Sequence, residues 1–361
     1  MVRSAKKITV TTSNDLVTDQ RMERICATLT DVGFEVEIVG RLLPNSFPIN
    51  PKEYIQTRLN LIFKKGPLFY FELNFRLLFY LLFNKPDIVY SVGADTALAG
   101  VLVKKLTKLI LIFDAHELFS EVPELLNEGK IKRIWQWIEK LIITKADIRI
   151  TVSQSVANYY ISKYKKPFEV IMNICRAKPI KIKTKGEKYI LYQGALNKGR
   201  GLAELIEASK SMEIKIKIAG DGDIADKLKQ QALDNIRVEF LGKLIPDELE
   251  EITVEAWLGY NLLEKQSLSY YYSLSNKTFD YIQAGIPQLM PDFPEYKKLN
   301  EEWGFGICVD LSSDEIVRTV SQLLKDENLY AKLKGNAENA LRVLTWEKEA
   351  VKLEKVFESL L

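Results

Sequence analysis

Short apolar runs alternate with segments of helical period from one end of this chain to the other. In the first half, the predicted strands are Lys7–Thr12, Phe34–Val39, Ile88–Val92, Leu109–Phe113, Ile148–Val152 and Glu169–Met172. In the second half, they are Tyr189–Gln193, Ile214–Ala219, Val238–Leu241, Leu258–Leu262, Gln288–Met290 and Ile307–Val309. Continuous apolar strands separated by helices are typical of parallel sheets that helices cover on both faces. The chain is therefore predicted to be an α/β protein.

The alternation stops once, between Arg176 and Glu187. This stretch contains an arginine, four lysines, a proline and a glycine, with no acid before Glu187. Such a composition is typical of an interdomain linker, and 361 residues are enough for two domains with separate cores. We predict two doubly wound, Rossmann-like domains, residues 1–177 and 188–345, joined by a linker at 178–187.

Composition narrows the classes of function. A net charge of +3, with basic residues mixed among acids, gives no support for nucleic-acid binding. The three cysteines are scattered and lack C-x-x-C spacing, which fits a reducing compartment and supports neither zinc nor a disulfide. No signal peptide is recognisable, and the most apolar segment, Leu68–Phe83, is too short and too charged to span a bilayer. We expect a cytoplasmic protein that can rest on the inner face of the cell membrane.

The run S-L-S-N-K-T-F-D-Y-I-Q-A-G-I-P, residues 273–287, carries the strongest chemical signal. It places Asn276, Lys277 and Asp280 on the first turns of a short helix that ends near Gly285. Backbone N–H groups, the helix dipole and a lysine together bind anions, and a carboxylate three residues later can take two neighbouring hydroxyls, as on a ribose. Spacing alone leaves an alternative, in which Ser275 or Asn276 is an N-cap beside a solvated lysine and acid.

The same run resembles the N-K-x-F-(D/E)-Y-x-x-A-G-x-P signature of the family 4, or group 1, glycosyltransferases. The resemblance extends from Ser13 to Trp346 and implies a GT-B fold, with two Rossmann-like domains facing a central cleft. It implies an acceptor side in the first domain, a donor-nucleotide site in the second, and a final helix, about residues 346–361, that packs back on the first. The implied reaction moves a sugar from a nucleoside diphosphate to a hydroxyl of a glycan or lipid-linked saccharide in cell-surface polysaccharide synthesis, with retention of configuration.

Two glycine-containing turns support the donor site. Residues 192–202, Y-Q-G-A-L-N-K-G-R-G-L, follow the first strand of the second domain, and Lys198 and Arg200 can reach a pyrophosphate there. The turn resembles the family's G-x-x-x-x-x-(K/R)-G loop, in which Arg200 corresponds to the diphosphate contact. Residues 219–222, A-G-D-G, resemble the family's A-G-x-G, although a tight turn is an equal alternative. The implied donor-binding residues are Gly194, Arg200, Gly201, Gly220, Gly222, Tyr272, Ser275, Asn276, Lys277 and Asp280.

The first domain contains the only histidine of the chain, His116, directly after a predicted strand. A lone histidine is more often structural than catalytic. However, D-A-H-E-L-F followed by Glu121 resembles the family's D-x-H-E-x-F, whose histidine faces the transferring sugar. The resemblance makes His116 and Glu117 the catalytic candidates and places Glu121 on the acceptor side; we expect the two glutamates to orient the histidine or the acceptor.

The first loop, S-N-D-x-x-x-D-x-R from residue 13 to residue 21, resembles a loop that borders the cleft in part of the family. It adds Asn14 and Asp15 to the acceptor side. Asp19 is instead expected to be the N-cap of a helix that runs from about Asp19 to Val32.

Two departures from the family pattern matter. Tyr272 stands where many members have the first of two glutamates, and Ala195 stands where many have an arginine. Both favour an alternative, a non-catalytic sugar-nucleotide-binding partner subunit of a transferase. A sugar-nucleotide epimerase is a third hypothesis, against which the single histidine argues. We expect no cofactor and no metal requirement, with Lys277 and Arg200 neutralising the diphosphate.

Two aromatic segments of the first domain can meet a membrane or a lipid. Residues 130–140 mix lysines and arginine with two tryptophans on one predicted helix. Residues 68–83 carry seven aromatic side chains and can form an apolar groove for the acceptor. For both, the alternative is a packed core face with a solvated basic edge.

Overall fold

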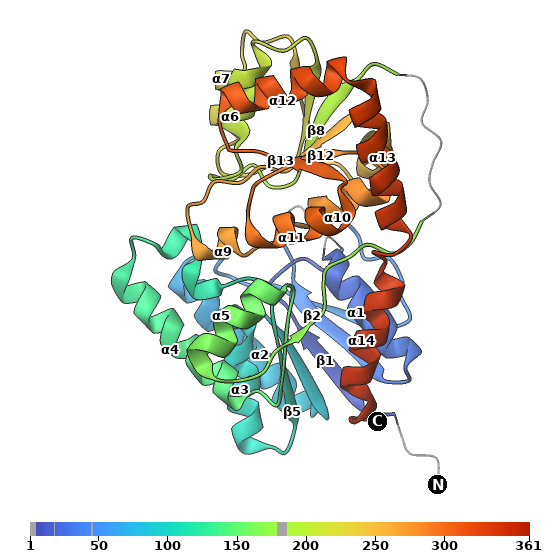
Figure 1. The fold of residues 1–361 in the computed structure, drawn as a ribbon. Coiled ribbons are helices and arrows are strands. Elements are labelled where there is room, and N and C mark those ends of the chain that lie inside the picture. The colour runs from blue at the N-terminus through green and yellow to red at the C-terminus, as the bar shows by residue number, and fades with distance from the viewer. Residues whose placement is uncertain (1–4, 18, 45, 179–185) are drawn as a thin grey trace. The chain divides into compact units, whose positions relative to one another are not determined.

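The computed structural model describes residues 5–17, 19–44, 46–178 and 186–361. The chain divides into two compact units, Met1–Asn173 with Glu347–Leu361, and Ile174–Trp346. Each unit is built on one parallel sheet (Figure 1), so the predicted fold class is confirmed. Most of the predicted linker, residues 179–185, falls outside the described residues.

The sheet of the first unit has the order β3-β2-β1-β4-β5-β6-β7, and all neighbouring strands are parallel. Its strands are β1 (Lys7–Thr11), β2 (Glu35–Arg41), β3 (Ile55–Leu59), β4 (Ile88–Val92), β5 (Ile110–Ala115), β6 (Ile148–Thr151) and β7 (Glu169–Val170). Val10 of β1 pairs with Ile38 on one side and Tyr90 on the other. The strand order reverses between β1 and β4, so the loops after these strands diverge and leave a crevice at their carboxyl ends.

Helices cover this sheet and return to it at the end of the chain. They are α1 (Gln20–Asp31), α2 (Pro67–Asn84), α3 (Ala94–Leu106), η1 (Phe119–Glu121), η2 (Pro123–Leu125), α4 (Gly129–Lys145), α5 (Gln154–Tyr164) and α14 (Trp346–Glu358). Asp19 caps α1 as predicted, because its Oδ1 accepts from Met22 N at 3.1 Å. The ring of Phe357 on α14 lies 5.8 Å from that of Phe34, and Met172 N donates to Glu349. Within the described residues, no helix is both long and apolar enough to cross a membrane.

The sheet of the second unit has the order β10-β9-β8-β11-β12-β13, again wholly parallel. Its strands are β8 (Tyr189–Gln193), β9 (Lys215–Ala219), β10 (Val238–Gly242), β11 (Leu258–Tyr260), β12 (Gln288–Met290) and β13 (Gly306–Cys308). Its helices are α6 (Leu202–Ser209), α7 (Ala225–Gln231), α8 (Pro246–Glu255), α9 (Leu268–Tyr271), α10 (Asn276–Gln283), α11 (Pro294–Trp303), α12 (Ser313–Lys325) and α13 (Glu327–Leu341). The switch point here lies between β8 and β11.

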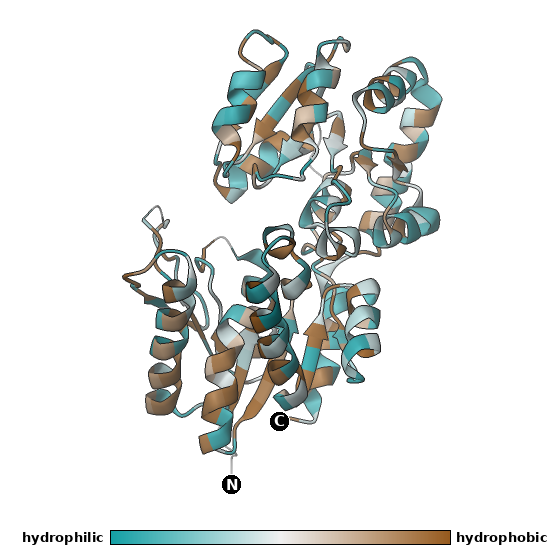
Figure 2. Cartoon of the chain, turned by 90° about the vertical axis from the view of Figure 1, so that its left-hand side faces the viewer, coloured by the Kyte–Doolittle hydropathy of each residue, from teal (hydrophilic) through white to brown (hydrophobic). Residues whose placement is uncertain are grey.

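Burial explains why these segments form strands. Ile190, Ile216 and Ile218 are fully buried between the helical layers of the second unit, and Ile8 and Val10 are fully buried in the first. Figure 2 accordingly shows the central strands mostly in the colour of apolar residues. Strand β3 was not predicted, because its sequence I-Q-T-R-L is not an apolar run and its residues are only partly buried at the sheet edge.

Candidate active site

Helix α10 points two charged side chains at the carboxyl end of β8. The Nζ of Lys277 lies 4.5 Å from the ring centroid of Tyr192, and Asp280 Oδ2 accepts from Gln193 Nε2 at 2.8 Å. The other oxygen of Asp280 accepts from Cys175 Sγ at 3.1 Å. Lys277 and Asp280 therefore share one helix face, as their spacing of three predicts.

Ser275 begins this helix without capping it through its side chain. Within the described residues, its Oγ instead donates to Asn261 Oδ1 at 2.7 Å, and its backbone N donates to Tyr296 Oη at 3.0 Å. Ser275 is thus the N-cap residue by position, as in the alternative, but the solvated lysine of that alternative is wrong, because Lys277 is buried. Asn276 is exposed as the first residue of α10.

The glycine turns after β8 and β9 pack backbone against backbone. Gly194 and Gly220 have φ of 128° and 144°, and a Cβ on Gly220 would lie 1.8 Å from the carbonyl oxygen of Gly194. A Cβ on Gly222 would lie 2.7 Å from backbone atoms of Leu196. Gly201, with φ of 63°, precedes α6 and accepts through its carbonyl from Tyr260 Oη. The tight turn expected at residues 219–222 is thus present, and it also brings bare backbone to the ends of β8 and β9. The role of these glycines in donor binding stays a prediction.

Arg200 and Lys277 make this end of the sheet electropositive. The guanidinium of Arg200 lies 4.8 Å from the ring centroid of Tyr270, and its Nε is buried without a hydrogen-bond partner among the described residues. Burial, reinforced by the nearby charge of Arg200, lowers the pKa of Lys277 well below 10.5, while Asp280 opposes the shift. A buried lysine and an unsatisfied guanidinium beside one carboxylate form a site that an anion would complete.

In the first unit, a pocket of about 140 Å³ lies at the carboxyl ends of β1, β4 and β5. It is lined by Thr12, Ser13, Asn14, Val92, Gly93, Ala94, Asp95, Phe113, Ala115, His116, Glu117 and Phe119. These residues come from the loops on both sides of the switch point. The structure therefore brings together three of the predicted residues, Asn14, His116 and Glu117.

Asp114 lies beside the histidine of this pocket. Its Oδ2 lies 3.2 Å from His116 Nε2 and accepts from Tyr90 Oη at 2.7 Å, while both of its oxygens accept from Arg21. Burial raises the pKa of Asp114, but Arg21 and His116 outweigh burial and hold it below its usual range. The carboxylate therefore stays ionised beside the imidazole, while the Nε2 atom of His116 makes no hydrogen bond of good geometry among the described residues. Sequence reasoning gave the orienting role to glutamates and missed this aspartate, although it stands two residues before His116.

The remaining predicted residues lie outside this pocket. Asp15 pairs with Arg58 at 2.6 Å, and Glu121 pairs with Lys132 at 2.6 Å while accepting from Tyr159 at 3.1 Å. In the second unit, Tyr272 ends α9 with its ring 5.3 Å from that of Tyr271. Ion pairing accounts for the positions of Asp15 and Glu121; their roles toward an acceptor stay predictions, as does that of Tyr272.

Comparisons with known proteins assign the chain to a family. Residues 20–175 match Glycosyltransferase Family 4, and residues 176–340 match Glycosyl transferases group 1. The chain is a group 1 glycosyltransferase. The family membership that the resemblance of residues 273–287 implies is confirmed. A comparison with curated proteins found no match.

Solved structures share the fold of this glycosyltransferase along nearly its whole length. Sucrose-phosphate synthase from Thermosynechococcus elongatus is 15% identical, with a TM-score of 0.81 over 98% of this chain and 99% of its own. HepE of Anabaena in complex with UDP-glucose is 13% identical, with a TM-score of 0.76 over 98% and 99%. WaaG, a glycosyltransferase involved in lipopolysaccharide biosynthesis, is 13% identical, with a TM-score of 0.75 over 97% and 99%. These likenesses confirm the GT-B fold.

Other residues at these strand ends were not predicted. Gln193 donates a hydrogen bond to Asp280, and Asn261 accepts one from Ser275. The guanidinium of Arg200 lies over the ring of Tyr270. Asp95 lines the pocket of the first unit, and burial raises its pKa. Gln193, Asn261 and Asp95 end or follow strands β8, β11 and β4, so their place at the switch points of a doubly wound sheet is a usable signal.

Gly220→Ala is expected to destabilise the glycosyltransferase by about 1–3 kcal/mol, because a residue with a side chain is strained at this φ and its Cβ meets the carbonyl of Gly194. Urea unfolding measures the change. Gly335→Ala is the matched control, since Gly335 lies within α13 with nothing within 4 Å of an added Cβ. That variant should be stabilised by about 0.5–1 kcal/mol. Equal stability of Gly220→Ala and the native protein would contradict the prediction.

Proposed function

We propose that this glycosyltransferase moves a sugar from a nucleoside-diphosphate sugar to a hydroxyl group of a glycan or lipid-linked saccharide, in cell-surface polysaccharide synthesis. The observation that carries the donor assignment is the pair of Arg200 and Lys277 beside Asp280. The two cations match a diphosphate, and the carboxylate matches the hydroxyls of a ribose. The UDP-glucose bound to HepE, which has a similar fold, supports a sugar nucleotide as the donor.

In the proposed reaction, the bond between the sugar and the diphosphate oxygen breaks, and the acceptor oxygen forms the new bond with retention of configuration. Lys277 and Arg200 stabilise the charge that grows on the leaving diphosphate. His116, which lies beside the ionised Asp114, contacts the transferring sugar and stabilises the transition state. The proton of the acceptor hydroxyl passes to the leaving diphosphate oxygen as the new bond forms, and the nucleoside diphosphate is released.

Thermal stabilisation by UDP-, GDP-, ADP- and TDP-sugars tests the donor site. A shift with one nucleotide family that disappears in Lys277→Ala supports the proposal and names the base. No shift with any of the four would contradict it. A shift without turnover on any acceptor would favour the non-catalytic partner subunit, to which Tyr272 and Ala195 point.

We propose further that the reaction needs no metal, because Arg200 and Lys277 supply the positive charge that a divalent ion would otherwise bring to the diphosphate. Transfer measured in about 5 mM EDTA should equal transfer in Mg²⁺ or Mn²⁺ within about twofold. Loss of activity in EDTA, with recovery on adding back one metal, would contradict metal independence. The same assay on Arg200→Ala checks the reason, because a metal should then partly restore the rate.

We also propose that the protein works in the cytoplasm, at the inner face of the cell membrane. The support is the first unit, where α2 and α4 expose several apolar side chains together with cationic ones. Sedimentation with anionic vesicles is the direct measurement. Absence of the protein from the vesicle pellet at low ionic strength would contradict membrane contact.

A further inference from the structure

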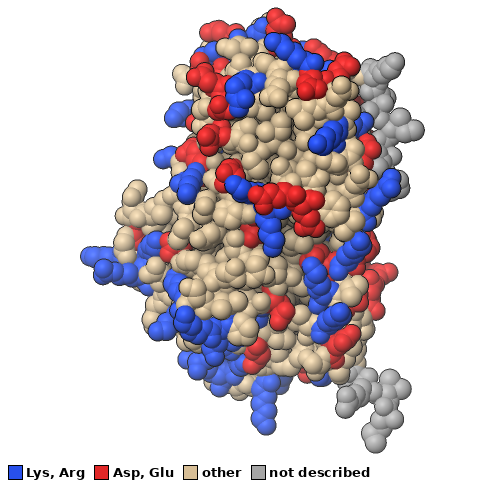
Figure 3. Space-filling view, in the orientation of Figure 1, with Lys and Arg blue, Asp and Glu red and all other residues tan. Residues whose placement is uncertain are grey.

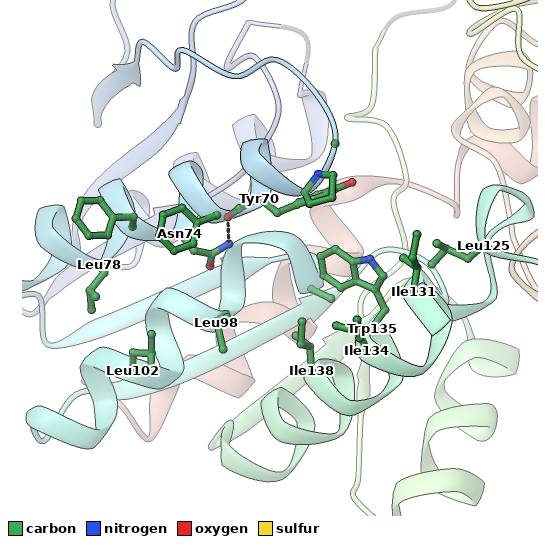
Figure 4. Close-up of a pocket in the computed structure, with 15 residues that line it drawn as sticks. Tyr70, Asn74, Leu78, Leu98, Leu102, Leu125, Ile131, Ile134, Trp135 and Ile138 are labelled. Atoms are coloured by element: carbon green, nitrogen blue, oxygen red, sulfur yellow. Dashed lines mark hydrogen bonds between the residues drawn. The ribbon is translucent and has the colours of Figure 1, made fainter. Parts of the chain in front are cut away.

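An apolar groove of about 610 Å³ runs between α2, α3 and α4 of the first unit (Figure 4). It is lined by Gly66, Pro67, Tyr70, Phe71, Asn74, Phe75, Leu78, Ala94, Leu98, Leu102, Leu125, Ile131, Ile134, Trp135 and Ile138. The figure shows Leu78, Leu98 and Leu102 toward one end, and Trp135, Ile131 and Leu125 toward the other. A groove of this size accommodates a long flexible ligand.

The amide group of Asn74 in this lining is already satisfied by the protein. The amide nitrogen of Asn74 donates to the carbonyl oxygens of Tyr70 and Asp95, at 2.9 and 2.6 Å, and its amide oxygen accepts from Ala99 N at 3.0 Å. The rings of Tyr70 and Phe119 lie 4.9 and 4.5 Å from that of Trp135. A sugar or peptide would find few partners here, whereas a hydrocarbon chain would lose none.

The groove adjoins the pocket of His116. Ala94 lines both cavities, and Phe119 of the small pocket packs on Trp135 of the groove. A molecule with a polar head and an apolar tail can therefore place its head near His116 and its tail between the helices. Because the apolar groove adjoins a polar pocket, the two cavities together fit an amphipathic ligand better than a purely apolar one.

The charge around the groove is divided: the pocket of His116 is lined by Asp95 and Glu117, which suit the hydroxyls of a saccharide, whereas the exposed face of α4 carries cations that suit a lipid phosphate. On α4, Lys130, Arg133 and Lys140 are exposed without a carboxylate partner among the described residues, and the one acid of this helix, Glu139, is buried. Figure 3 shows more lysine and arginine than acid where Figure 1 draws α3, α4 and α5. Cations beside an apolar surface are typical of sites that bind lipid phosphates.

The outer face of α2 extends the apolar surface. Phe71, Phe75, Phe79 and Phe83 are spaced by four residues, and 69%, 51%, 44% and 81% of their surfaces are exposed. Successive rings lie 6.0, 4.8 and 6.5 Å apart. For these four side chains, the alternative of a packed core face is wrong. Contiguous exposed apolar patches of this kind mark surfaces that contact a ligand, a membrane or another protein.

We propose that the α2–α3–α4 groove binds the hydrocarbon chain of a lipid-linked acceptor whose head group enters the pocket of His116. The inference rests on the proposed function and narrows it, because it makes the lipid part of the acceptor a recognised element of the substrate. It predicts affinity that grows with chain length until the groove is full. Each methylene placed in the groove should tighten binding about fourfold.

Quenching of tryptophan fluorescence by bromoalkyl phosphates below their micelle concentration tests the groove. Bromine quenches on contact, so 11-bromoundecyl phosphate should quench saturably and 5-bromopentyl phosphate should bind at least about a hundredfold more weakly. Trp135→Phe should remove the quenching. Trp137→Phe is the matched control, because Trp137 lies on the same helix, is 63% exposed and is absent from the lining.

A charge in the groove gives a second test. Leu98→Lys should weaken binding of the long probe by at least about tenfold. The alkyl chain of the probe would then remove water from the lysine ammonium, and this desolvation costs free energy. Leu102→Lys, at a site already 37% exposed, takes its place if Leu98→Lys does not fold. Quenching that survives both the lysine variant and Trp135→Phe, or that disappears only in Trp137→Phe, would overturn the proposal and place the chain on the outer surface. Donor-induced stabilisation is measured separately: a protein that responds to a sugar nucleotide but not to the probes keeps its proposed function and loses only the groove.

Discussion

Replacing Lys277 with methionine is expected to make the free protein more stable and to abolish its stabilisation by sugar nucleotides. The side chain is 8% exposed, its ammonium faces the ring of Tyr192, and a nearby arginine repels its charge. Methionine has a similar length without the charge that burial penalises, so the free energy of unfolding should rise by about 1–3 kcal/mol. Loss of the diphosphate contact should lower kcat/KM by about a hundredfold to a thousandfold.

Two thermal melts, with and without the sugar nucleotide, measure both effects. The expected gain in stability of the free protein and loss of donor binding cannot both come from a disrupted fold, because a variant with a disrupted fold loses stability as well as binding. Lys332→Met is the matched control, since Lys332 lies exposed on α13 of the same second unit and should change neither quantity by much. A lower melting temperature for free Lys277→Met would contradict the account of a strained, desolvated lysine.

The lowered pKa of Lys277 also gives the stability of the free protein a pH dependence. Between the native pKa and 10.5, the unfolded chain holds a proton that the folded chain lacks, so stability rises with pH in this window. A bound diphosphate favours the charged amine, so binding takes up a proton there and weakens as pH rises. Calorimetry of donor binding in buffers of different ionisation enthalpy measures the proton uptake. Lys277→Met should lose both dependences.

The fold followed from sequence because its strands are buried on both faces. The run Tyr189–Gln193 is buried at every position, and so is Ile88–Val92, so apolar continuity alone marks them. Two helices follow each other closely in residues 313–341, because Asp326 ends α12 and caps α13 by accepting from Leu329 N at 2.9 Å. A capping aspartate inside a helical pattern is a local signal that the periodicity of apolar residues hides.

The site was harder to predict because its residues are joined through space. The motif around Lys277 predicted that a lysine and an aspartate share one helix face, and both lie at the carboxyl end of β8. In contrast, the buried contacts of Asp114 with Arg21 and Tyr90 bring together three distant segments, and no spacing reveals them. The stripe of four phenylalanines on α2 is a similar case. Their spacing of four residues fits a buried core face as well as an exposed one, and only the structure shows that they are exposed.

His116→Ala is expected to lower kcat by about a hundredfold to a thousandfold while leaving donor binding unchanged. The imidazole lines the 140 Å³ pocket of the first unit, whereas the cations proposed for the diphosphate belong to the second. Asp114 is buried and keeps a partner in Arg21, so the loss of the partly exposed histidine should cost little stability. Initial rates at saturating donor, compared with the native protein, give the change in kcat.

The thermal shift caused by the sugar nucleotide serves as the internal control for this variant. A normal shift with a low kcat means that the histidine acts on the transition state and not on donor binding. A rate within about twofold of the native protein would show that His116 is a structural residue, as lone histidines often are. Loss of rate and shift together would point to a disturbed fold, and Asp114→Asn would then separate the two causes. That variant keeps the imidazole but leaves Arg21 buried beside a neutral amide, so a destabilisation of about 3–5 kcal/mol is expected from it alone.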